Sequence, residues 1–247
     1  MPEFGRLGVD KIPFTTPFMA PLYPAPPWKF EDSEILLMSY EIDKDLAEQS
    51  LPPALSRSYP PYGHIMVSHC PSSPVGPFSH ATQMVVCRWR TTARAFPLLT
   101  IVSTEAACAA FREFWAFPAK LGEVTLERNG DGVSASIGRG GQVLASVRVT
   151  ELEEVTAGEM RYDPMMNPRI VRAAREEDEP PVLELDQIDP DYTYKQTWRG
   201  QGEVEFPAAS DDDPWHVMEN RNHIATTFAV CDTELGFARY VVSYDEP

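Results

Sequence analysis

Apolar and polar residues alternate along short runs of this chain, and glycine or proline separates one run from the next. Alternation with a period of two is typical of strands, since successive side chains point to opposite faces of a sheet. On this pattern His64 shares a strand face with Met66, and His80 begins a similar row in the next strand. Strands are expected at residues 34–41, 64–69, 79–89, 98–102, 123–127, 133–137, 142–151, 183–189, 192–198, 202–206, 222–230 and 237–244.

Helical patterns are confined to short segments. Residues 42–51 are amphipathic with Asp43 as the N-cap, residues 104–110 follow a Thr104 cap, and residues 215–220 indicate one helical turn. About ten short strands with two or three helices predict a mainly β (α+β) domain, built as an antiparallel β-barrel with a few packed helices.

Residues 1–27 are rich in proline, a composition that favours an extended arm. The expected organisation is therefore an arm of residues 1–27 followed by a single domain of residues 28–247. The arm carries Phe14, Phe18 and Met19, and contacts between subunits are one way to bury them. A homo-oligomer is expected, although the arm can equally fold back on its own domain.

Composition narrows the class of protein. A net charge of −16 opposes binding to nucleic acid and to anionic membranes. No apolar run is long enough for a transmembrane helix, no signal peptide is visible, and the cysteines are scattered as in reduced, cytoplasmic proteins. His64 and His69 point to opposite faces of one strand, so no metal site is expected. No nucleotide-binding or metalloprotease motif occurs, and no cofactor is expected.

The most distinctive segment is residues 111–122, which read FREFWAFPAKLG. Pro118 should end a preceding helix, and Gly122 should release the chain into the strand at 123–127. Lys120 stands at this corner among aromatic residues, where desolvation would make its amine more nucleophilic. An ordinary lysine whose stem covers apolar surface is the simpler interpretation of this residue taken alone.

This segment resembles the signature of the acetoacetate decarboxylase-like family, approximately G-R-E-x-W-x-[FY]-P-K-K-L. The first lysine of that signature forms a Schiff base with the substrate ketone, and here Ala119 holds its position. The resemblance runs from about residue 28 to residue 242 and implies a closed barrel with a ligand cavity inside. The matching positions are Arg112, Glu113, Trp115, Phe117, Pro118, Lys120 and Leu121.

A second family motif, approximately G-P-[YF]-x-E-A, resembles residues 76–81 and places His80 where the family has a cavity glutamate. His64 corresponds to a second cavity glutamate and Ser33 to a cavity arginine. The resemblance thus implies a cavity with His80, His64 and Lys120 as the catalytic candidates. The residues expected to contact a substrate are Arg112, Glu113, Trp115, Phe117, Phe78, Ser33 and Ala119.

Three functions stay open. Because alanine cannot form an imine and histidines suit proton transfer near neutral pH, the first is an acid–base cyclase, isomerase or dehydratase that works without a Schiff base. Its substrate would be a β-keto or polyketide-like small molecule of secondary metabolism. The second is an imine-forming decarboxylase, aldolase or dehydratase that uses Lys120. The third is a non-catalytic barrel that binds a small molecule.

The two histidines are expected to lie within reach of one ligand. Paired strands lie about 4.8 Å apart, so facing side chains on neighbouring strands can meet at one substrate. Repulsion between two protonated rings should then lower the pKa of one of them.

Overall fold

The computed structural model describes residues 5, 8–130, 132–175 and 182–244. They contain the helices α1 (Lys44–Gln49) and α2 (Glu105–Glu113) and 3-10 turns at Val9–Lys11, Ala157–Glu159 and Trp215–Val217. None of these helices has the length and apolarity needed to cross a bilayer. The strands are β1 (Trp28–Glu41), β2 (Ser56–Arg57), β3 (Tyr62–Cys70), β4 (Phe78–Trp89), β5 (Thr92–Val102), β6 (Ala119–Leu121), β7 (Glu123–Asn129), β8 (Gly132–Arg139), β9 (Gln142–Glu154), β10 (Met165–Val171), β11 (Val182–Ile188), β12 (Asp191–Glu205), β13 (Asn222–Leu235) and β14 (Tyr240–Ser243).

The strands form one large sheet whose main path runs β14-β11-β10-β5-β4-β3-β1-β13-β12-β9-β8-β7. Within the described residues the two end strands, β7 and β14, do not pair with each other, so the expectation of a closed barrel is wrong. The reason lies in β5, whose second edge is divided between two partners. Ala95 pairs with Met165 of β10, whereas residues 100–102 pair with β6. In the part of the chain described, no single strand follows that edge and closes the sheet.

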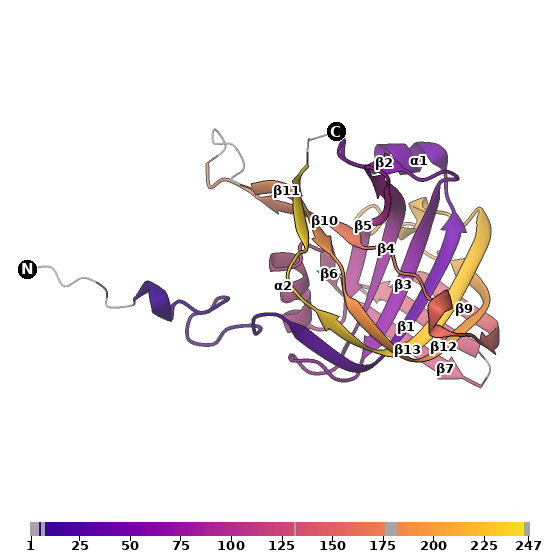
Figure 1. Ribbon diagram of the computed structural model, residues 1–247, viewed down its shortest axis with the longest axis horizontal. Helices are drawn as coiled ribbons and strands as arrows, with labels where there is room; N and C mark the ends of the chain where they lie inside the picture. Colours follow the sequence, from indigo (N-terminus) through magenta and orange to yellow (C-terminus); the bar gives the residue numbers. More distant parts are fainter. Residues whose placement is uncertain (1–4, 6–7, 131, 176–181, 245–247) are drawn as a thin grey trace, which may run out of the picture.

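The central strands β1, β3 and β4 are buried on both faces. In β1, Leu36 and Met38 belong to a first core that β7, β8 and β9 complete, while Ile35 and Leu37 belong to a second core that includes α2. Figure 1 shows α2 to the left of β3 and β4 and β7 to their lower right. Polar side chains on the second face of these strands are therefore held inside the protein.

Most of the expected elements are confirmed, several with longer bounds. The predicted N-cap is correct, because the Asp43 carboxylate accepts hydrogen bonds from the backbone N–H groups of Asp45 and Leu46. The two strands expected at 192–198 and 202–206 are one strand, β12. Gly200 does not break it: a Cβ there would lie 2.7 Å from the Thr150 carbonyl oxygen, so the glycine permits close approach of β9.

The described part of the arm contacts the body at the end of α2 and at Trp28. The Tyr23 hydroxyl donates to the Glu113 carboxylate over 2.8 Å, and the rings of Phe14 and Phe114 lie 5.2 Å apart. Further from the body the arm extends into the open in Figure 1, and Met19 is 98% exposed. The apolar arm is therefore only partly covered by its own domain.

We expect this arm to contact a second copy of the chain. Replacing the exposed Phe18 and Met19 by serine should lower the molecular mass measured by light scattering, because the substitutions remove apolar surface that the domain leaves uncovered. Unfolding monitored by circular dichroism serves as the control that the domain itself is intact. A wild-type protein that is monomeric at micromolar concentration would contradict the expectation.

Candidate functional site

The second core encloses a small cavity of about 40 Å³, here called the inner cavity. Among the described residues that line it there is no lysine, arginine, aspartate or glutamate. Three residues expected at the site, His80, Ser33 and Phe117, are part of its wall. The full lining is Phe30, Ser33, Ile35, Met66, Ser68, Cys70, His80, Phe111, Phe117, Met165, Pro190, Tyr192, Thr233 and Leu235.

His80 projects from β4 into an aromatic environment. Its ring centroid lies 5.0 Å from that of Phe111. The ring also stacks on Phe78, with 6.0 Å between the two centroids. The residue is 9% exposed, and its Nδ1 is buried without a hydrogen-bond partner. Burial lowers the pKa of His80 to about 4, so the imidazole is neutral near pH 7. Phe78 itself contacts this ring and does not line the cavity.

A larger cavity of about 410 Å³, the outer cavity, adjoins the first. His64 belongs to its wall, with Nδ1 2.9 Å from the Ser39 hydroxyl and Nε2 3.6 Å from an Asp163 carboxylate oxygen. The outer cavity holds ionisable groups that the inner one lacks. Its lining is Leu37, His64, Met66, Met84, Ala95, Met160, Arg161, Tyr162, Asp163, Pro164, Met165, Asp189, Pro190, Tyr192 and Tyr194.

The two histidines do not meet at one ligand position, which corrects the expectation from the sequence. Both face the second core, but His80 pairs with Ser68 of β3, whereas His64 pairs with Met84 of β4. The pairing offset of four residues separates them by about 13 Å along the strands. The lowered pKa of His80 accordingly comes from burial and not from repulsion by His64.

The aromatic corner, residues 111–122, fixes the end of α2, and most of its residues that were expected to contact a substrate line neither cavity. Arg112 donates to the Ala119 carbonyl oxygen over 2.7 Å, and the Trp115 indole N–H donates to Gly236 over 2.8 Å. Glu113 binds the arm through Tyr23. These three residues lie outside both cavity linings and hold the corner together.

Ala119 and Lys120 are neighbours in β6 and face opposite ways. Ala119 is fully buried in the second core, in the same apolar cluster as Phe117. Lys120 points to the loop before the turn at 215–217, where its amine lies 2.9 Å from an Asp213 carboxylate oxygen. Arg139 contacts the other oxygen of Asp213 at 2.8 Å. Lys120 therefore closes an ion-pair cluster and lines neither cavity.

Sequence reasoning missed the residues that lie between the two cavities. Met66, Met165, Pro190 and Tyr192 line both of them. The position of Met66 could be predicted from the sequence, because alternation places it on the same strand face as His64. The other three come from distant segments that meet β3 only in the folded chain, so no local pattern pointed to them.

Comparison with known proteins supports this architecture. A family model described as "Acetoacetate decarboxylase (ADC)" matches residues 12–244. Acetoacetate decarboxylase of Burkholderia ambifaria (strain MC40-6) is 26% identical over 127 residues, which cover 51% of this chain and 52% of that protein. The chain thus spans about half the length of the curated relatives it matches.

Solved structures share the fold across nearly the whole chain. Acetoacetate decarboxylase from Legionella pneumophila aligns with a TM-score of 0.84 at 23% identity, over 98% of each chain. An acetoacetate decarboxylase-like enzyme from Sphingomonas wittichii RW1 gives 0.78 at 18% identity, over 93% of this chain and 98% of the other. The enduracididine biosynthesis enzyme MppR gives 0.79 at 15% identity, over 98% and 100%.

The burial of His80 predicts a specific pH dependence of stability. An imidazole that is neutral in the folded protein but protonates near its ordinary pKa of about 6.5 when unfolded favours unfolding in acid. The stability of the wild type relative to His80→Gln should therefore fall as the pH drops from about 6.5 to about 4, by on the order of 3 kcal/mol. Urea unfolding of both proteins from pH 8 to pH 4 measures this difference in stability. If the free energies of unfolding of the two proteins differ by the same amount at every pH, the prediction is refuted.

Proposed function

The chain belongs to the acetoacetate decarboxylase family, and from this premise we propose that it is an enzyme that moves protons on a ketone without forming an imine. The reaction class is cyclisation, isomerisation or dehydration of a β-keto or polyketide-like substrate. One observation carries the proposal: a neutral histidine with an unpaired buried nitrogen stands in the wall of a cavity that no described lysine lines.

The inner cavity suits a neutral carbonyl group. Its described polar members are hydroxyl, thiol and imidazole groups, and none carries a charge near pH 7. An unpaired carboxylate placed there would lose its hydration without gaining a counter-charge, which is costly. The carboxylate of a keto acid is therefore disfavoured in this cavity, whereas a ketone oxygen can accept a hydrogen bond from His80 or Ser33.

His80 would act on the carbonyl oxygen. When a proton passes from the carbon beside the carbonyl to a solvent water molecule, the electron pair of the C–H bond moves onto the carbonyl oxygen, and an N–H donor aimed at that oxygen stabilises the negative charge. A histidine with a lowered pKa is neutral and fits this donor role, whereas it is a weak base. At about 13 Å from His80, His64 would act on another part of the same substrate, where the Ser39 hydroxyl and Asp163 lie beside its ring.

The alternative that uses Lys120 requires a rearrangement. Its amine would have to leave Asp213 and turn to the opposite face of β6, where Ala119 lies buried. A biosynthetic setting is supported by the fold neighbour MppR, an enduracididine biosynthesis enzyme. The third function, a protein that binds small molecules without turning them over, is indicated if the experiments below detect no turnover.

The first experiment compares two variants in a proton-transfer assay. The wild type should accelerate deuterium exchange beside the carbonyl of butanone, measured by NMR. His80→Leu should lose most of this acceleration, about 100-fold or more, because leucine has no donor for the carbonyl oxygen. Lys120→Ala should stay within about twofold of the wild type, since its amine faces Asp213. Loss of exchange in Lys120→Ala with a mild effect in His80→Leu would establish the lysine mechanism instead.

The second experiment tests the absence of imine chemistry. Incubation with acetoacetate and borohydride, followed by intact mass measurement, should give no covalent adduct, and carbon dioxide release should be slow, because Ala119 has no amine. Acetoacetate decarboxylase of Burkholderia ambifaria is the positive control for the assay. A trapped adduct that disappears in Lys120→Ala would overturn the proposal in favour of an imine.

A further inference from the structure

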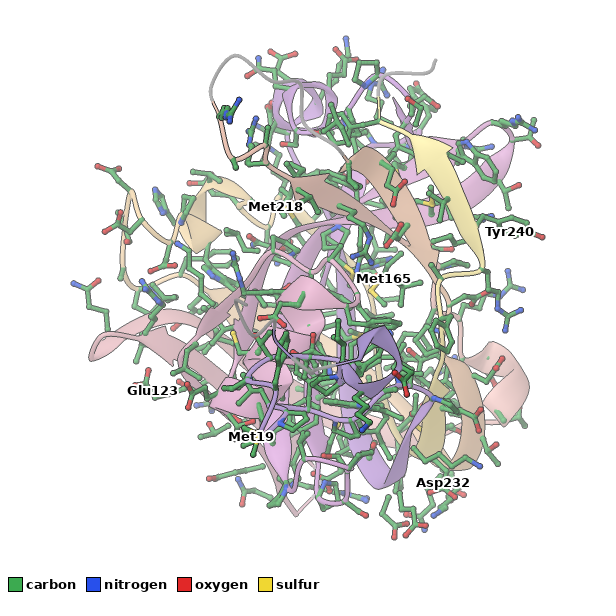
Figure 2. The ribbon with its side chains drawn as sticks, turned by 90° about the vertical axis from the view of Figure 1, so that its left-hand side faces the viewer. Met19, Glu123, Met165, Met218, Asp232 and Tyr240 are labelled. Carbon is green, nitrogen blue, oxygen red and sulfur yellow. The ribbon has the colours of Figure 1, made fainter. Side chains whose placement is uncertain are left out.

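The two cavities are immediate neighbours. They share the four lining residues Met66, Met165, Pro190 and Tyr192, and Figure 2 shows Met165 near the middle of the body. The inner cavity, about 40 Å³, is roughly a tenth of the size of the outer cavity, about 410 Å³. A ligand with its carbonyl beside His80 must therefore continue past Tyr192 into the outer cavity.

The wall along that route is a stack of tyrosines. Tyr192 and Tyr194 lie on the same face of β12 with ring centroids 5.9 Å apart and planes only 13° from parallel. Tyr162, from the segment after β9, lies 4.9 Å from the ring of Tyr192 at 31°. All three line the outer cavity and present nearly parallel π-faces. Such faces favour an offset-stacked planar partner.

Methionines complete the outer cavity. Met66, Met84, Met160 and Met165 belong to its wall together with Leu37. Thioether side chains are polarisable, make favourable contacts with aromatic rings and adapt to irregular shapes. Tyrosine and methionine together favour a flat, apolar ligand body over a flexible charged one.

Charges are few along this route, and most have protein partners. Asp163 faces His64, and Asp189 lies 3.3 Å from Arg239. Burial raises the pKa of Tyr192 and of Tyr194, so the phenol rings remain uncharged. Arg161 is exposed and belongs to the wall of the outer cavity, where it can meet a polar end of a ligand. The middle of the route is thus neutral and aromatic.

We propose that the substrate is an aryl or conjugated ketone, longer than a simple keto acid, whose carbonyl end enters the inner cavity while its planar body stacks on Tyr162, Tyr192 and Tyr194. This inference rests on the proposed function and names the substrate class of the same site. It follows from the shared lining, the small inner volume and the parallel tyrosine rings.

Calorimetric titration of the full chain with three neutral diketones tests it. The probes are acetylacetone, which is short, benzoylacetone, which adds a phenyl ring, and the cyclohexyl analogue of benzoylacetone, which is equally long but not flat. Benzoylacetone should bind about 10-fold tighter than acetylacetone and about 3-fold tighter than the cyclohexyl analogue. Tyr194→Leu should weaken the binding of benzoylacetone about 3- to 10-fold, and Tyr194→Phe should bind benzoylacetone as tightly as the wild type does.

The controls separate this inference from the proposed function. Acetylacetone affinity should be unchanged in Tyr194→Leu, which also shows that the variant is folded, and Tyr240→Leu, a change at an exposed tyrosine of β14, should leave all three affinities as they are. Binding of acetylacetone that depends on His80, with benzoylacetone binding no tighter, would overturn the aryl substrate and leave the proposed function standing. Failure of all three probes to bind would overturn both.

Discussion

The structure depends on the burial of β1, β3 and β4 on both faces. One face is covered by β7, β8 and β9 and is mostly apolar, with Gln83 as a buried polar residue; the other is covered by α2, the aromatic corner and the segments around β10 and β12. A polar side chain on the second face has no access to bulk water except through the cavities. Each one must find a protein partner or remain unpaired at a cost of about 1–3 kcal/mol. His80 remains unpaired at Nδ1, which is why it stands out as the functional candidate.

The neutral character of the inner cavity is consistent with an alanine at position 119 in the second core. No lysine, arginine, aspartate or glutamate is among the described residues that line the cavity. A carboxylate or guanidinium placed there would lack a counter-charge, and an unpaired buried charge is far more costly than a neutral polar group. Ser33 and His80 are neutral near pH 7, so the polar groups of the wall form one electrostatically consistent set.

Much of the fold was predictable because alternation and turn residues are local signals. The strands, the Asp43 cap and the end of α2 before Pro118 follow from residues that are close in sequence. Closure of the sheet was not predictable, because it depends on how β6 and β10 divide one edge of β5. The face of His64 and His80 was also predictable, but their separation was not, since the pairing offset between β3 and β4 is set by the turn between them and by packing.

Strand geometry also explains why Lys120 does not line the inner cavity. Successive residues of a strand point to opposite faces, so a shift of one position in sequence reverses the direction of the side chain. On its own face Lys120 meets Asp213, a carboxylate that is 5% exposed and that also accepts from Arg139. Burial raises the pKa of Asp213, but the hydrogen bonds from Lys120 and Arg139 outweigh it and hold the pKa below its usual value.

Turning Lys120 inward would leave that carboxylate with one partner and place an ammonium among apolar side chains, and both changes are unfavourable. The chemistry proposed for this site therefore rests on groups already on the cavity face, and His80 and Ser33 are two of the described polar residues that line the inner cavity.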